Sequence, residues 1–301
     1  MHRFLRPQVL LPLGLLVLTA AYLLVALALV YGATRPERKP FEAHPGDFAL
    51  KYEDVSFTPR GEALTLRGWL LPGSTGAPYL IFVHGIGDQR TGNDALELAS
   101  RLVQQDGYNV LLFDLRAQGT SDGDFVSAGE FERYDVLGAY DFLIGRGAEP
   151  GRVGLVGRSY GAATAIMAAA LEPGIAAVVA DSPFAEVRDR IARETARKTP
   201  IPQGLVRIFL PPADLFADLL YDIHLDDLKP ERDVAKLEYP ILVIHGEADE
   251  RIPISEGRRV HAAAPTGSQF WTLPGVSHAD AFPTHPEEYL QRVRAYLGDR
   301  F

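Results

Sequence analysis

Short apolar runs that alternate with helical patterns dominate the sequence from residue 49 onward. The runs are YLIFVHG (79–85), YNVLLFD (108–114), RVGLVG (152–157), IAAVVAD (175–181), PILVIHG (240–246) and SQFWTLP (268–274). Strands buried on both faces of a parallel sheet have this composition, because helices cover both faces. Two alternating segments, 49–57 and 63–71, predict an antiparallel hairpin at one edge. The pattern therefore predicts an α/β fold with a mostly parallel sheet.

One segment, at about 185–239, interrupts this alternation. More than fifty residues pass there without a convincing strand, and a loop of that length without secondary structure is improbable. A charged helical stretch (185–198) precedes an apolar stretch (204–225) that Pro211 and Pro212 interrupt. We predict a small helical cap insertion.

A long uncharged stretch, VLLPLGLLVLTAAYLLVALALVY, occupies the 23 residues 9–31. As a helix it would be about 35 Å long, enough for a hydrocarbon layer of about 30 Å. The alternative is a cleaved secretory signal, whose apolar region is usually only about 7–15 residues. We predict a retained membrane anchor (1–33), a Pro- and charge-rich linker (34–48) and a globular domain (49–301).

Basic residues flank both ends of the apolar stretch, so comparing their numbers by the positive-inside rule does not settle the orientation. The short basic stub before the stretch favours an extracytoplasmic domain.

Composition excludes several functional classes. Lys and Arg total 30 against 39 Asp and Glu, a net charge of −9, and no long basic run suggests nucleic-acid binding. The absence of cysteine from the sequence excludes disulfides, thiolate nucleophiles and Cys-ligated zinc. HExxH, phosphate-loop and dinucleotide glycine patterns are also missing, so we expect no metal and no organic cofactor.

The sequence Gly157-Arg158-Ser159-Tyr160-Gly161 follows a predicted strand and precedes a predicted helix. G-x-S-x-G at such a junction is typical of a nucleophile elbow, in which a tight turn lifts the serine above the carboxyl edge of the sheet. Side chains at positions 157 and 161 would collide where strand and helix pass closest. A Gly/Ser turn without catalytic function is the alternative.

A serine nucleophile needs a base, and the base needs an acid that orients it. In this architecture the chain order is serine, acid, histidine. His278, in LPGVSHAD directly after the last strand, is the favoured base. His261 lies within a predicted helix and His285 beside Pro286 at a helix start, where packing or capping roles are expected.

The favoured acid is Asp249, in VIHGEADERIP after the penultimate strand. Its neighbours Glu247 and Glu250 are ordinary solvated carboxylates in this interpretation. The rival is Asp181, at the end of the preceding strand, from which a carboxylate could also reach the imidazole.

Acyl transfer further requires N–H donors aimed at the developing oxyanion. The residue after the nucleophile, Tyr160, supplies one, and the loop VHGIGDQR after the first parallel strand supplies the other at Ile86. His84 is then expected to shape this loop and not to act as a base.

Together these segments resemble the α/β-hydrolases, in particular bacterial hydrolases related to the prolyl-oligopeptidase and serine-aminopeptidase (S33-like) groups. The similarity covers FVHGIG, FDLRAQGTSDGD, GRSYGAATA, ADSPF, LVIHGEADERIP and LPGVSHADAFPTHPEEYLQRVRAYL. The resemblance implies an eight-stranded sheet with helices on both faces and a helical cap between strands six and seven. It places the catalytic triad at Ser159, Asp249 and His278, and the oxyanion donors at Ile86 and Tyr160.

Two positions depart from the family pattern. Arg158 stands where small or apolar residues are common, and we expect a solvated or cap-facing cation, with anion binding as the alternative. Ala117 and Gln118 stand where relatives usually show a glycine, so that loop is altered. The polar residues around them are expected to be structural: Asp114, Arg116 and Ser121.

The expected activity is hydrolysis of carboxylic esters through an acyl-enzyme, with a small-molecule acyl substrate. A peptidase or thioesterase using the same triad is the alternative within hydrolases. A catalytically silent scaffold that binds a ligand at the membrane is the alternative from another class.

Apolar cap residues could line an acyl pocket, touch the bilayer or simply pack on the sheet: Leu205, Phe209, Leu210, Leu215, Phe216 and Leu219.

Overall fold

The computed structural model describes residues 7–41, 43–92, 94–198 and 202–301. An eight-stranded sheet forms its centre, in the order β1-β2-β4-β3-β5-β6-β7-β8. The strands are β1 (Glu53–Phe57), β2 (Leu66–Leu71), β3 (Tyr79–Val83), β4 (Asn109–Phe113), β5 (Val153–Arg158), β6 (Ile175–Asp181), β7 (Leu242–Gly246) and β8 (Gln269–Leu273). β2 pairs antiparallel with β1 and β4, and all other pairs are parallel. The predicted mostly parallel sheet with an antiparallel edge hairpin is confirmed.

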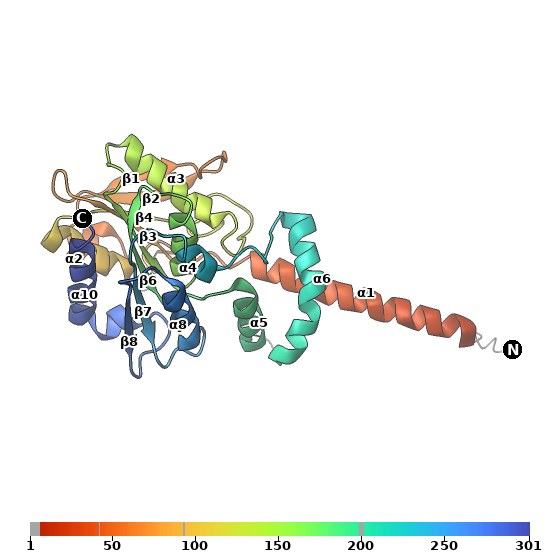
Figure 1. Ribbon diagram of the computed structural model, residues 1–301. Coiled ribbons are helices and arrows are strands. Elements are labelled where there is room, and N and C mark those ends of the chain that lie inside the picture. The colour runs from red at the N-terminus through yellow and green to blue at the C-terminus, as the bar shows by residue number, and fades with distance from the viewer. Residues whose placement is uncertain (1–6, 42, 93, 199–201) are drawn as a thin grey trace.

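Helices cover both faces of this sheet (Figure 1). They are α2 (Ala95–Asp106), α3 (Glu132–Gly145), α4 (Tyr160–Ala169), α8 (Ile254–Ala263), α9 (Ala281–Thr284) and α10 (Pro286–Gly298). Side chains alternate across β3, so Ile81 packs in the core with α3 and α4, whereas Leu80 packs in the core with α2 and α10. The strands read as unbroken apolar runs because both of their faces are buried.

The cap lies between β6 and β7, as the family resemblance implied. It consists of α5 (Val187–Lys198), α6 (Gln203–Tyr221) and α7 (Pro230–Val234). Our expectation that two prolines interrupt the apolar stretch is wrong, because α6 runs through Pro211 and Pro212. Proline at position 212 cannot donate to the carbonyl of Ile208, four residues earlier. The hydroxyl of Tyr22 donates to that oxygen instead, at 2.7 Å.

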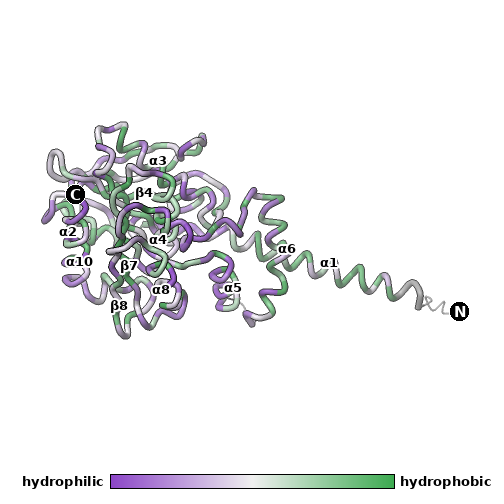
Figure 2. The backbone as a smooth tube through the Cα atoms, in the orientation of Figure 1, coloured by the Kyte–Doolittle hydropathy of each residue, from purple (hydrophilic) through white to green (hydrophobic). Residues whose placement is uncertain are grey.

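Tyr22 belongs to α1 (Pro7–Thr34), a helix that extends away from the sheet (Figure 1). Most of its residues are hydrophobic, as the colouring of the tube in Figure 2 shows. Within the described residues it is the one helix long and apolar enough to cross a membrane. Leu11 to Ala21 are exposed, whereas Ala26 and Val30 are buried against the body of the protein.

The segment predicted as a linker lies against the globular domain. The Arg38 guanidinium donates to the carbonyl oxygens of Ser121 at 2.7 Å and of Gly119 and Gly123 at 3.0 Å. Phe41 packs on Trp69, with ring centroids 5.2 Å apart, and a 3-10 helix, η1 (Pro45–Phe48), follows. The end of α1 is therefore held in a defined position relative to the sheet.

The hydroxyl of Tyr296 on α10 joins β6 to the segment that precedes β7, near a register shift between β5 and β6. β5 and β6 shift by one residue, with Val153 opposite Ile175 but Gly154 opposite Ala177. Beyond the shift, the N–H of Val178 donates to the Tyr296 hydroxyl at 2.9 Å, and that hydroxyl donates to the carbonyl of Pro240 at 3.0 Å. Removing the hydroxyl would leave two buried backbone groups without partners.

Tyr296→Phe should therefore lower the free energy of unfolding by about 1–3 kcal/mol, measured by urea titration in detergent. Tyr239→Phe is the matched control, since the Tyr239 hydroxyl is buried and has no hydrogen-bond partner among the described residues. Its free energy of unfolding should stay within about 0.5 kcal/mol of the wild type. Equal effects of the two substitutions would contradict the bridging role.

Candidate active site

Ser159 sits in a strained turn between β5 and α4. Its φ of 55° and ψ of −119° are unusual for a residue with a side chain, and the strain persists because the surroundings hold the turn. A Cβ on Gly157 would lie 2.4 Å from the carbonyl oxygen of Gly161. A Cβ on Gly161 would lie 2.0 Å from the carbonyl oxygen of Val83. Both glycines are required by the close passage of strand and helix, as we expected from the sequence.

The structure brings Ser159, His278 and Asp249 together. His278 Nε2 lies 2.7 Å from Ser159 Oγ, and His278 Nδ1 lies 2.6 Å from Asp249 Oδ2. Because the carboxylate accepts from Nδ1–H, the Nε2 lone pair faces the serine hydroxyl. The three side chains come from the loops that follow β5, β7 and β8, at the carboxyl edge of the sheet. This geometry can transfer the serine proton to the imidazole.

Asp249 is held as a carboxylate. Burial alone would raise the pKa of this group, but hydrogen bonds from His245 and His278 and from the N–H of Ile252 lower it well below its usual range. His245 Nε2 lies 2.8 Å from the carbonyl oxygen of Ile252 and 3.4 Å from Asp249 Oδ2. We therefore attribute the lowered pKa mainly to His278 and to the N–H groups of Arg251 and Ile252, which donate to Oδ1 at 2.9 and 2.8 Å.

The alternative residues occupy other positions. Asp181 is fully buried at the end of β6, where its carboxylate accepts from the Ser182 hydroxyl at 3.1 Å and burial raises its pKa. His261 lies with Nε2 3.0 Å from the carbonyl oxygen of Ser268. His285 is at the start of α10, with Nδ1 3.0 Å from the hydroxyl of Thr284. The backbone carbonyl of Asp181 accepts from the N–H of Ser159 at 2.7 Å, but no side-chain hydrogen bond of these three residues in the described part of the chain reaches the side chains of Ser159 or His278.

The predicted oxyanion donors, Ile86 and Tyr160, lie close to Ser159 along the chain or in space. Tyr160 begins α4, and neither N–H has a protein acceptor within the described residues. A Cβ on Gly85 would lie 3.9 Å from Ser159 Cβ, so the loop that carries Ile86 lies beside the nucleophile. N–H groups near a nucleophile that have no protein acceptor are candidates for an oxyanion site.

His84 shapes this loop, as predicted. Its Nε2 accepts from the N–H of Leu115 at 3.0 Å, so Nδ1 carries the proton and donates to the carbonyl of Gly85 at 2.7 Å. Gln118 adds a support that sequence reasoning missed: its Oε1 accepts from the N–H of Gly87 at 2.6 Å. The sequence offered one signal for this support, because Gln118 stands in a loop where relatives usually show a glycine.

Our expectation for Arg158 is wrong. The side chain is buried, with its guanidinium carbon 5.5 Å from the ring centroid of Phe282 and 5.8 Å from that of Tyr289. It is opposite Asp181 on the neighbouring strand, and the two charges attract. The position on β5 directs the side chain into the core next to α9 and α10, which sequence spacing alone does not reveal.

The structural role predicted for Asp114 is confirmed, since it accepts from Arg90 and Thr120.

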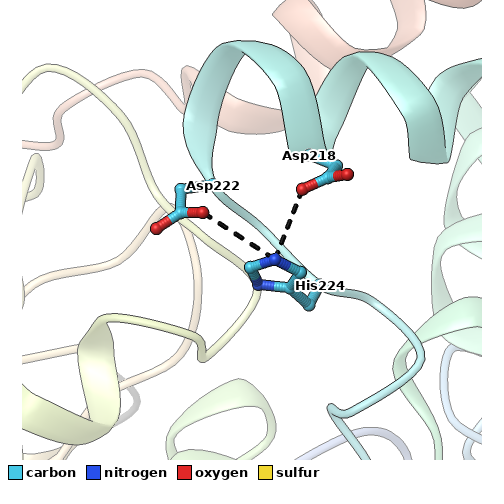
Figure 3. A group of neighbouring side chains, drawn as sticks. All are labelled: Asp218, Asp222 and His224. Atoms are coloured by element: carbon cyan, nitrogen blue, oxygen red, sulfur yellow. Dashed lines mark ion pairs between the residues drawn. The ribbon is translucent and has the colours of Figure 1, made fainter.

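A second group of histidine and carboxylates lies at the end of α6 (Figure 3). His224 Nε2 is 3.3 Å from Asp218 Oδ1 and 3.8 Å from Asp222 Oδ1, and all three residues are exposed. Exposed acidic groups beside a histidine are common on protein surfaces. We assign this group no role beyond ion pairing at the surface of the cap.

Two adjoining cavities lie between α1, the cap and the loop of Ile86. Their volumes are about 80 and 340 Å³. The residues that line both are Leu29, Ala33, Ile86, Arg190, Ile191 and Thr195. Of the cap residues expected to form an acyl pocket, Leu210 lines the smaller cavity, whereas Leu205, Leu215 and Leu219 are exposed on the outer surface of α6.

Comparison with known proteins agrees with this fold. The family model described as X-Pro dipeptidyl-peptidase (S15 family) matches residues 31–199. Uncharacterized protein YqkD of Bacillus subtilis (strain 168) is 28% identical over 195 residues, which cover 64% of this chain and 63% of that protein, slightly less than two thirds of its length.

Among solved structures, the Pyrococcus furiosus esterase Pf2001 is 25% identical with a TM-score of 0.72, covering 89% of this chain and 98% of the esterase. A membrane phospholipase A, described as a novel bacterial virulence factor, is 20% identical with a TM-score of 0.61. That likeness covers 98% of this chain and 99% of the phospholipase. At this identity it supports the fold alone.

The lowered pKa of Asp249 has a consequence for stability. A carboxylate whose pKa is lower in the folded state contributes stability that is fully present above its unfolded pKa, about 3.9, and is lost as pH falls toward the folded pKa. The free energy of unfolding of the wild type should therefore fall relative to that of Asp249→Asn as pH drops below about 4. Glu250→Gln, which removes an exposed carboxylate from the same loop, should follow the wild-type profile. Parallel profiles for wild type and Asp249→Asn, measured by denaturant titration, would contradict this assignment.

Proposed function

This chain belongs to the X-Pro dipeptidyl-peptidase (S15) family of serine hydrolases, and from that premise we propose that it cleaves carboxylic esters through an acyl-enzyme. The observation that carries the proposal is the hydrogen-bonded series Ser159–His278–Asp249. The N–H groups of Ile86 and Tyr160, which have no acceptor among the described residues, support it. The family and the fold make the chain an enzyme of the esterase or peptidase type, so a silent scaffold is not pursued further.

The proposed reaction follows from the geometry. Ser159 Oγ attacks the acyl carbon while His278 Nε2 takes its proton, and Asp249 stabilises the imidazolium. The oxyanion accepts from the N–H groups of Ile86 and Tyr160, each worth about 3–4 kcal/mol in the transition state. The leaving alcohol takes the proton from Nε2. Water then attacks the acyl-enzyme with the same base, which releases the carboxylic acid and restores the serine.

The cavities beside the site favour an ester over a peptide substrate. A dipeptidyl-peptidase must accommodate the cationic N-terminal ammonium of its substrate, which calls for a free carboxylate. The ionisable residues lining the two cavities are Arg190, Asp214 and Glu194. Asp214 is paired with Arg188 and Glu194 with Arg197. The cation Arg190 and the apolar lining fit an uncharged acyl group better. A peptidase remains the second candidate, because the family description favours it.

We further propose that α1 is a single-pass membrane anchor, with the catalytic domain on the extracytoplasmic side. The contacts of its last turns support a retained helix over a cleaved signal. Tyr22 bonds to the cap, the carbonyl of Thr34 accepts from the N–H of Val126 at 2.8 Å, and Arg35 donates to the hydroxyl of Tyr221 at 2.7 Å. Cleavage within this stretch would remove groups that the folded domain uses.

A fluorophosphonate probe tests the nucleophile. The wild type should be labelled and Ser159→Ala should not, and kcat for p-nitrophenyl butyrate should fall about 10⁵–10⁶-fold in the variant. Ser277→Ala removes an exposed serine next to His278 and should retain labelling and turnover. Labelling of the Ser159→Ala variant would show that the nucleophile is another residue.

The choice between ester and peptide is tested with the same preparation. p-Nitrophenyl butyrate should be hydrolysed with a kcat/KM at least about 100-fold higher than that for Gly-Pro-p-nitroanilide, because the cavities lack a free carboxylate for the ammonium group. The ratio is measured at matched pH in detergent micelles. A higher value for the dipeptide anilide would replace the esterase proposal with the peptidase.

A further inference from the structure

The length of α1 places its last turns outside a bilayer. Its 28 residues extend about 42 Å at 1.5 Å per residue, about 12 Å more than the hydrocarbon thickness of about 30 Å. That excess corresponds to roughly the last eight residues. Val30 and Thr34 in this region, and Ala26 just before it, are buried against the protein, whereas the turns from Leu11 to Ala21 are exposed. The part of α1 that packs on the protein therefore includes the turns that leave the hydrocarbon layer.

The cap helix α6 crosses α1 at Tyr22, more than one turn before these last eight residues (Figure 1). Tyr22 joins them through its hydrogen bond to Ile208 and through ring packing on Phe209, with centroids 5.3 Å apart. The outer side of α6 carries exposed apolar residues: Leu205, Ile208, Leu215, Leu219 and Leu220. Figure 2 shows hydrophobic residues along α1 and in α6 where the two helices cross. A bilayer surface is the environment that fits exposed leucines next to a membrane-spanning helix.

The two cavities open between these helices and the catalytic edge. Leu29 and Ala33 of α1, Ile191 of α5 and Ile86 of the loop after β3 line both cavities. Ile86 is also the proposed oxyanion donor, and its neighbour Gly85 lies beside Ser159. The larger cavity, about 340 Å³, is at the lower end of the range for ligand pockets. The space between the membrane helix and the nucleophile is therefore lined mainly by apolar side chains.

We propose that α1 is one wall of the acyl-chain site, and that the substrate is the acyl ester of a membrane lipid whose chain enters between α1 and the cap. This deepens the proposed esterase function and rests on it. The ester C–O bond breaks, water supplies the hydroxyl of the released fatty acid, and the lipid alcohol leaves with a proton. The anchor then both holds the enzyme at the bilayer and selects its substrate.

Filling the cavity from α1 tests the proposal. In the full-length chain in micelles, Leu29→Trp should lower kcat/KM for p-nitrophenyl laurate about tenfold or more and leave that for p-nitrophenyl acetate within about twofold. A short acyl group does not need the cavity, whereas each excluded methylene of a long chain loses burial. Leu24→Trp is the matched control, because Leu24 lies on the same helix, is 63% exposed and lines neither cavity. It should leave both esters unchanged.

Ile191→Trp fills the same cavity from the cap and should reproduce the selective loss. In phosphatidylglycerol vesicles, the reconstituted wild type should release fatty acid and both filling variants should release at least about tenfold less. Unchanged laurate hydrolysis in Leu29→Trp and Ile191→Trp would overturn the proposal, and so would an equal loss on both esters. Acetate hydrolysis by the wild type that does not depend on Ser159 would instead mark a failure of the esterase function itself.

Discussion

The close passage of α4 over β3 and β5 is the constraint on which the site depends. It is possible only because Gly157 and Gly161 lack side chains, since a Cβ at either position would lie within 2.4 Å of a backbone oxygen. This packing holds Ser159 in its strained conformation at the end of β5. It also brings the loop after β3 next to Ser159, directly before the first residue of α4.

The remaining groups reach this point through the parallel sheet. Because β7 and β8 extend the sheet in register with β6, the loops that follow them end at the same edge as the elbow. Asp249 is buried and receives two backbone N–H bonds, so it stays ionised and oriented toward His278. Gln118 and His84 support the oxyanion loop from β4 and β3. Rigid elements thus position each group of the proposed proton relay.

The apolar helix and the cap form a second functional unit in our proposal. Proline at position 212 removes a hydrogen bond within α6, and Tyr22 of α1 satisfies the carbonyl left behind. Proline at position 212 would weaken an isolated helix, but here the carbonyl that it leaves free accepts a specific hydrogen bond between the anchor and the cap. The cavities bounded by Leu29 and Ile86 connect this contact to the catalytic edge.

The sequence by itself determined the features that depend on local pattern. Buried strands, helical periodicity and the glycines around Ser159 are written into neighbouring residues, so the sheet, the cap insertion and the elbow could be predicted. The sequence favoured Asp249 as the acid but left Asp181 as a rival, because both follow parallel strands. Only the tertiary structure decided that Asp249 contacts His278, that Arg158 is buried, that Gln118 supports the oxyanion loop and that α1 packs on α6. These outcomes depend on which face of a strand or helix meets a distant partner, and that is set by the packing of the whole chain.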